Sequence, residues 1–265
     1  MSKVIMVANQ KGGAGKTSSC VDIGFLLAKK GYKTLFIDLD AQCNLTDAVG
    51  YDYDDDPNNR DTIFSYVLDM RTYDECVKKL RPDLDLYLIP GSRKMLSQYF
   101  VGDGDVYFLR DKISELVEKG NFDFILIDVG PEGGNLMTMA FLASDYVIAV
   151  AHLAKHSYQG VMQMIKDIGQ GKSKYINFNV KPLGLLITES KKTIIGDYNR
   201  DRFIEASELF APLFATEISH SAKMDECKEF GVPIHEYQPK SKLAAQYRAV
   251  TEEILERITS DGTTI

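Results

Sequence analysis

The stretch Asn9-Gln10-Lys11-Gly12-Gly13-Ala14-Gly15-Lys16-Thr17 decides the fold of this chain. It follows an apolar run at residues 4–8 and opens a helical pattern, so it is predicted to join a buried strand to a helix. Its glycines let successive backbone N–H groups point at one anion, because a residue without a Cβ adopts the required conformations freely. The N-terminus of the following helix adds partial positive charge. The stretch therefore predicts a loop that wraps a polyphosphate.

The loop is a Walker A motif with one departure, since it starts at Lys11 and reads K-G-G-x-G-K-T. The pattern predicts a nucleotide site formed by Gly12, Gly13, Ala14, Gly15, Lys16, Thr17 and Ser18. Lys16 can reach the β- and γ-phosphates of ATP, and the Thr17 hydroxyl can bind Mg²⁺. A flexible turn with two solvated lysines is the simpler alternative. A dinucleotide site fits poorly, because the third glycine of that motif is absent.

Carboxylates follow two further apolar runs, at the ends of predicted buried strands. Residues 33–38 end in Asp38 and continue to Asp40, and residues 122–128 end in Asp128. Because the carboxyl ends of parallel strands meet at one edge of a sheet, these side chains are expected beside the loop. Phosphoryl transfer needs a positioned nucleophile and a cation that neutralises charge. We therefore expect Thr17 and Asp128 at Mg²⁺. The alternative to a role in the reaction is structural: Asp40 and Asn44 would then only cap the next turn.

The composition and the alternation of strand and helix patterns predict one α/β domain over residues 1–265. The chain has 265 residues, 45% hydrophobic and 26% charged. The fold class expected is a single P-loop NTPase domain, with a mostly parallel twisted sheet and helices on both faces. Further strands are expected at 85–89, 144–150 and 181–188, and helices at 18–30, 62–69, 73–80, 105–119, 158–168 and 242–258. Residues 50–60 read as a solvated loop rather than a calcium site.

Charge and cysteine usage indicate which partners and which cell compartment to expect for the protein. The net charge of −7 argues against a globally basic nucleic-acid binder, although residues 181–248 are balanced. Four scattered cysteines without metal-ligand spacing indicate reduced thiols. Neither a signal peptide nor a run of eighteen apolar residues is present, so a cytoplasmic protein is expected.

The chain resembles the ParA/Soj-type partition ATPases of the deviant Walker A superfamily, which also includes MinD. Lys11 matches their second lysine, Asp38, Asp40 and Asn44 match D-x-D-P-Q-G-N, and the stretch from 237 to 247 resembles Y-D-P-x-S-x-G-A-x-A-Y. Ala41 and Cys43 depart from that pattern, as do Gly130 and Glu132 from D-x-P-P-S. The resemblance implies an ATP hydrolase in which Lys11, Lys16 and Asp40 are catalytic, with Asp40 polarising the attacking water. It also implies that Asp38 belongs to the metal site, beside the hydration shell of Mg²⁺. It also implies a homodimer in the ATP state.

The resemblance further implies non-specific DNA binding, a ParB-like centromere-binding partner that stimulates slow hydrolysis, and association with the nucleoid. Basic residues in matching or neighbouring segments are candidate DNA contacts: Lys191, Lys192, Arg200, Arg202, Lys223 and Lys228. Solvated lysines and arginines without a ligand are the alternative reading. No helix-turn-helix extension is expected before Lys3.

Two other functions stay open on the sequence. One is a MinD-like ATPase that positions a membrane or scaffold component and never binds DNA. The last predicted helix argues against a membrane, because its exposed side carries Glu252, Glu253 and Glu256 instead of a basic face. The other is a metabolic P-loop enzyme that phosphorylates or amidates a small molecule.

Overall fold

Strand β1 (Lys3–Ala8) lies in the middle of the molecule and carries the phosphate loop at its end. All six of its residues are buried, because β5 and β6 flank it on both sides and helices cover both faces. The computed structural model describes residues 2–51, 60–95, 99–100, 102, 104–191 and 193–262. The predicted loop at 50–60 falls mostly outside these ranges.

Within the described residues, seven strands form one sheet in the order β3-β4-β2-β5-β1-β6-β7. Strands β1, β2, β4, β5, β6 and β7 run parallel, and β3 is antiparallel to β4. The bounds are Thr34–Leu39 for β2, Lys78–Lys79 for β3, Leu86–Ile89 for β4, Phe124–Val129 for β5, Tyr146–His152 for β6 and Lys181–Thr188 for β7. The expected mostly parallel sheet is confirmed.

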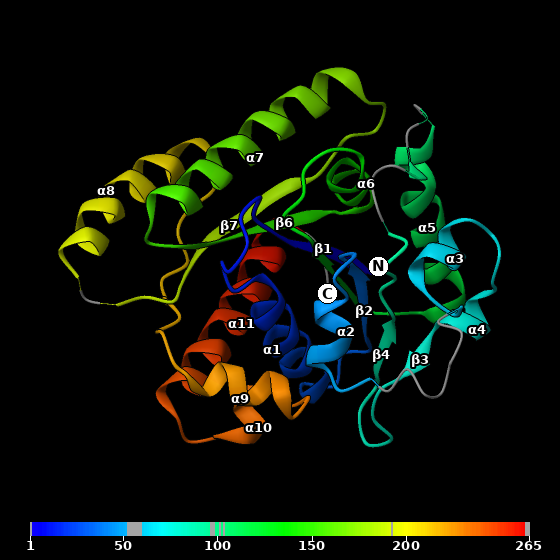
Figure 1. The fold of residues 1–265 in the computed structure, drawn as a ribbon, viewed down its shortest axis with the longest axis horizontal. Coiled ribbons are helices and arrows are strands. Elements are labelled where there is room, and N and C mark those ends of the chain that lie inside the picture. The colour runs from blue at the N-terminus through cyan, green and yellow to red at the C-terminus, as the bar shows by residue number, and fades with distance from the viewer. Residues whose placement is uncertain are drawn as a thin grey trace.

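Helices cover both faces of this sheet, as expected (Figure 1). One core contains residues of α3 (Ile63–Val67), η3 (Asp105–Tyr107), α5 (Phe108–Gly120), α6 (Asn135–Ala143), α7 (Lys155–Lys174) and α8 (Ile194–Leu209). The opposite core contains residues of α1 (Lys16–Lys29), α2 (Asn44–Ala48), α9 (Lys223–Glu229), α10 (Ile234–Tyr237) and α11 (Lys242–Ser260). Each face therefore has its own hydrophobic core.

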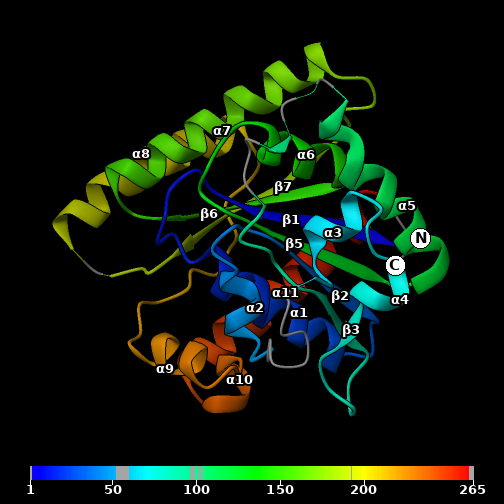
Figure 2. The same ribbon diagram turned by 45° about the vertical axis from the view of Figure 1, so that its right-hand side comes forward.

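The carboxyl ends of the parallel strands share one edge of the sheet, and the functional loops gather there. Asp38 of β2 and Asp128 of β5 are paired in register as Cα partners. The loop after β1 leads directly into α1 at the same edge, beside α2 and α9 (Figure 2). The arrangement matches the general preference of open α/β sheets for ligand sites at this edge.

One predicted helix is wrong over its second half. The pattern at 73–80 gives only α4 (Tyr73–Cys76), after which Val77 adopts an extended conformation. Lys78 and Lys79 then pair with Leu88 and Tyr87 as β3. Hydrogen bonds to the edge of the sheet thus outweigh a weak local helical pattern.

Candidate functional site

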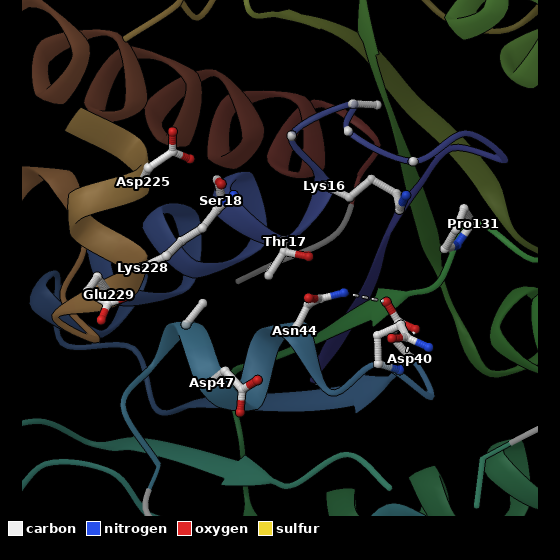
Figure 3. Close-up of a pocket in the computed structure, with 16 residues that line it drawn as sticks. Lys16, Thr17, Ser18, Asp40, Asn44, Asp47, Pro131, Asp225, Lys228 and Glu229 are labelled. Carbon is white, nitrogen blue, oxygen red and sulfur yellow. Dashed lines mark hydrogen bonds between the residues drawn. The ribbon is translucent and has the colours of Figure 1, made fainter. Parts of the chain in front are cut away.

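The phosphate loop opens into a cavity of about 500 Å³ at the carboxyl edge of the sheet (Figure 3). Helix α1 starts at Lys16, directly after Gly15 in the left-handed conformation at φ 77°. The cavity is lined by Gly12, Gly13, Ala14, Gly15, Lys16, Thr17 and Ser18, by Asp40, Gln42, Asn44, Asp47, Ala48 and Pro131, and by Asp225, Lys228 and Glu229. Every residue predicted for the nucleotide site thus faces one cavity.

Neighbouring strands and helices hold the two ends of the loop. At its start, Asn9 Nδ2 donates to Val150 O at 2.7 Å and to Ser157 Oγ at 3.1 Å. Near its end, Thr188 Oγ1 donates to Ala14 O at 2.7 Å. All three hydrogen bonds are buried, where an unmade hydrogen bond is costly. The loop geometry is therefore preorganised by β6, α7 and β7.

The two lysines of the loop lie in different environments. Lys16 is 7% exposed, and its Nζ donates to Lys11 O at 3.1 Å. Burial lowers the pKa of the Lys16 ammonium, and the carboxylates of Asp128 and Asp40 oppose this effect. Lys11, in contrast, is exposed to solvent. Lys16 is thus held inside the site, whereas Lys11 can reach a group outside this chain.

Thr17 and Asp128 form a site whose donors suit a divalent cation. Thr17 Oγ1 donates to Asp128 Oδ2 at 2.7 Å. The other carboxylate oxygen of Asp128 is buried, and no hydrogen bond satisfies it within the described residues. Burial raises the pKa of Asp128 to about 7, and the Asp38 carboxylate adds to the increase. A hydroxyl beside an unsatisfied buried carboxylate oxygen fits Mg²⁺, which prefers oxygen ligands.

Asp38 lies next to this pair but is engaged in holding the chain. Its Oδ2 accepts from Thr46 N at 2.9 Å and from Thr46 Oγ1 at 2.6 Å, and its Oδ1 accepts from Asp40 N at 3.1 Å. Thr46 Oγ1 in turn accepts from Gly91 N at 2.8 Å. Burial raises the pKa of Asp38 to about 6. In this geometry Asp38 fixes α2 and the end of β4, and its role at Mg²⁺ stays a prediction.

Asp40 lies in the wall of the cavity, and two hydrogen bonds hold its carboxylate. Gln42 N donates to Oδ1 at 2.9 Å, and Asn44 Nδ2 donates to Oδ2 at 3.0 Å (Figure 3). A Cβ at Gly130 would lie 2.9 Å from Asp40 Oδ1, so the departure from D-x-P-P-S leaves room for this carboxylate. The proposed turn capping by Asp40 and Asn44 therefore coexists with a position facing the cavity.

The sequence matches the family model described as an AAA domain over residues 2–181. The chain belongs to this AAA-domain family. The chromosome partitioning protein ParA of Myxococcus xanthus is 28% identical over 98% of this chain and 90% of its own length. The chromosome-partitioning ATPase Soj of Treponema pallidum is 26% identical over 97% of this chain and 98% of its own. The predicted resemblance to ParA/Soj-type P-loop partition ATPases is confirmed.

A solved structure adds a bound nucleotide to the comparison. Cobyrinic acid a,c-diamide synthase from Mycobacterium smegmatis, with bound ADP and magnesium, has a TM-score of 0.78 and is 26% identical to this chain. The match covers 100% of this chain and 98% of that one. Nucleotide and magnesium binding thus occur in a protein of similar fold.

The described basic residues proposed for DNA come from three segments, namely the loop after β7, helix α8 and helix α9. Arg200 is paired with Glu217 through Nη2 at 3.1 Å, Arg202 lies 4.3 Å from the Tyr158 ring, and Lys223 Nζ is 2.7 Å from Glu226 Oε1. Helix α8 packs into one core and α9 into the opposite one. Lys191 is exposed, and Lys192 lies outside the described residues. Lys228 lines the cavity. DNA binding by these residues stays a prediction.

Sequence reasoning missed part of the cavity wall. Gln42, Asp47 and Ala48 come from the turn before α2 and from α2 itself, and Asp225 and Glu229 come from α9. Both helices are short, and they meet the loop only through tertiary packing. The signal available in the sequence is that residues 216–234 also resemble a stretch of the partition ATPases, but a resemblance does not say where a segment lies relative to the loop. Among the described residues, no helix has the length and apolar character needed to cross a membrane.

Proposed function

We propose that this chain is an ATP-dependent switch that closes a homodimer around bound nucleotide and serves DNA partition. One observation carries the proposal. An exposed lysine, Lys11, lies beside a cavity that combines buried Lys16, the Thr17–Asp128 pair and the fixed carboxylate of Asp40. The partition proteins among its relatives support the biological role.

Each residue of the cavity has a chemical task in this proposal. The backbone N–H groups of the loop and the start of α1 bind phosphate oxygens, and the Lys16 ammonium neutralises their charge. Thr17 and Asp128 hold Mg²⁺, which when bound stabilises charge on the β- and γ-phosphates. Asp40 accepts a hydrogen bond from the attacking water and orients it. Its contacts with Gln42 N and Asn44 reduce the motion that would misalign this water.

Lys11 has a task that only a second copy of the chain completes. Its side chain is exposed, whereas Lys16 is already directed into the cavity. We propose that Lys11 contacts the phosphates bound by the partner subunit, so that ATP joins the two subunits. Hydrolysis removes the γ-phosphate and with it part of this attraction. The dimer would therefore form with ATP and separate after hydrolysis.

The proposed cargo is DNA, bound without sequence preference by the closed dimer in the cytoplasm. A ParB-like centromere-binding partner would stimulate hydrolysis and release the DNA. Lys191 is one candidate contact, since it is exposed just after the carboxyl end of β7. Binding through phosphates should weaken steeply with salt. Retention on DNA that is insensitive to salt would contradict this part of the proposal.

The dimer is tested by light scattering after size-exclusion chromatography, with MgATP and with MgADP. The wild type should dimerise with MgATP alone, Lys11→Ala should bind ATP as a monomer, and Asp40→Ala should stay dimeric because ATP is not consumed. Lys119→Ala, on α5 with a side chain 58% exposed, is the matched control and should behave as the wild type. ATP-dependent dimerisation of Lys11→Ala would refute the role of Lys11.

Two assays separate this proposal from other functions. Sedimentation with anionic liposomes and MgATP tests the MinD-like alternative, which requires lipid binding without DNA binding. Turnover that depends on a small acceptor molecule would instead support an enzyme of the kind represented by the cobyrinic acid a,c-diamide synthase. Hydrolysis of ATP without an acceptor is expected here.

A further inference from the structure

Helix α9 forms one wall of the nucleotide cavity, although it lies more than two hundred residues after the phosphate loop. Asp225, Lys228 and Glu229 are three and four residues apart, so they share one face of the helix. That face lines the cavity, while Met224 and Cys227 on the other side are buried in the core. The wall is therefore a fixed surface that presents selected side chains to the ligand.

The side chain of Lys228 is directed across the cavity toward Ser18 at the start of α1 (Figure 3). No ion pair or hydrogen bond holds its ammonium within the part of the chain that the structure describes. Lys223 on the same helix is different, because its Nζ donates to both oxygens of Glu226, at 2.7 and 2.9 Å. A lysine that is free and faces a phosphate-binding helix start is available for an anion.

The backbone of α9, which carries Lys228, is held relative to α1 by hydrogen bonds that run through α10. Asp22 of α1 accepts from Ile234 N at 3.0 Å and lies 3.2 Å from His235 Nδ1. Tyr237 OH donates to Glu226 of α9. Helices α9 and α10 are thus joined to the helix that carries Lys16 and Thr17. The contacts fix where α9 lies and leave the Lys228 side chain free to move.

The charges of the wall show why a cation is needed at this place. Asp225, Glu229 and Asp47 line the same part of the cavity, and their carboxylates repel a nucleotide. Lys16 lies at the end of the loop that receives the β- and γ-phosphates. Ser18, two residues further along α1, also lines the cavity, so a nucleotide with its β- and γ-phosphates at Lys16 would have its α-phosphate on this side. Lys228 is the cation that faces this end among the described lining residues.

We propose that Lys228 is a third nucleotide-binding lysine, supplied by α9 and directed at the α-phosphate of the bound nucleotide. This inference rests on the proposed function, since it assumes that the cavity binds MgATP. It moves Lys228 from the candidate DNA contacts to the nucleotide site.

The test compares Lys228→Met, Lys228→Arg and the control Lys223→Met by isothermal titration with MgATP and with MgADP. Both nucleotides carry an α-phosphate, so Lys228→Met should weaken both about tenfold and leave their ratio unchanged, as expected for a lost bond to a charged group. Lys228→Arg should recover most of the affinity, and Lys223→Met should match the wild type. Thermal unfolding without nucleotide should be the same for all four proteins.

Three results would overturn the inference. The first is Lys228→Met affinity within twofold of the wild type, and the second is an equal loss in Lys223→Met. The third is normal nucleotide affinity with lost DNA retention, which would assign Lys228 to DNA. If instead the wild type itself binds no MgATP, the proposed function is wrong, and the assignment of Lys228 to nucleotide falls with it. Lys16→Ala, which should abolish nucleotide binding, shows what the complete loss of binding looks like in the same titration.

Discussion

Replacing Gly130 by alanine should misplace Asp40 without removing its carboxylate. The new Cβ would lie 2.9 Å from Asp40 Oδ1 and 3.1 Å from Cγ, whereas ordinary van der Waals contact starts near 3.4 Å. The carboxylate must then move by about half an ångström, since the new Cβ is fixed directly to the backbone at the buried position 130. Its bonds with Gln42 N and Asn44 oppose that movement. The substitution therefore tests position separately from chemistry.

The expected effect is on the rate of hydrolysis and not on binding. A misplacement of 1 Å can cost about a hundredfold in rate, so half that distance corresponds to about tenfold, or about 1.4 kcal/mol in the barrier. The Kd for MgATP should stay within about twofold, because the loop and Lys16 are untouched. Single-turnover hydrolysis and equilibrium titration measure the two quantities.

A matched control lies in the same loop. A Cβ at Gly133 would meet its nearest neighbour, Gln10, at 3.7 Å, which is an ordinary contact. Gly133→Ala should therefore hydrolyse ATP at the wild-type rate. If Gly130→Ala is folded and also hydrolyses at the wild-type rate, the position of Asp40 does not limit the reaction, and the reasoning is wrong.

Three further predictions concern stability and the loop. Asp22→Ala removes the carboxylate oxygen that accepts from the buried Ile234 N–H and contacts His235 Nδ1. Because two donors lose their partner, the free energy of unfolding in urea should fall by roughly 2–6 kcal/mol, and a fall of under about 1 kcal/mol would contradict this. Without Mg²⁺, the free energy of unfolding should fall as pH rises from about 4 to 7, because the folded state holds the pKa of Asp128 near 7, above its ordinary value. Asp128→Asn should reduce this slope, and an unchanged slope would exclude Asp128 as its source. Thr188→Val should weaken nucleotide affinity severalfold, because Ala14 O loses its hydrogen bond and the loop is less well held. Titration with MgADP measures the affinity, and Thr259→Val on the surface of α11 is the control.

The centre of the fold and of the site could be predicted because contiguous residues encode them. The strand, glycine loop and helix around Lys16 form one local unit, and the strands that end in Asp38 and Asp128 are uninterrupted apolar runs. The common edge of a parallel sheet then brings these carboxylates to the loop. Their pairing in register as Cα partners confirms this step.

The elements missed by pattern reasoning lack a local signal. Helix α6 is apolar almost all round, with seven buried residues, so it shows no amphipathic stripe. Helix α8 exposes Ile194, Ile195 and Tyr198, which reverses the usual relation between hydrophobicity and burial. Helix α9 has seven residues. The position of α9 against α2 depends on contacts across the whole chain, and so does the cavity wall that contains Lys228.

Helix α1 is buried along nearly its whole length, with only Lys29 and Thr17 absent from its buried residues. Packed between the sheet and helices α2 and α11, it cannot shift without disrupting the core. The helix that binds phosphate is therefore expected to keep its position when a nucleotide binds. Helices α2 and α9 are held by hydrogen bonds as well, so superposition on the sheet of forms with and without nucleotide should show a displaced Lys228 side chain beside an unmoved α1.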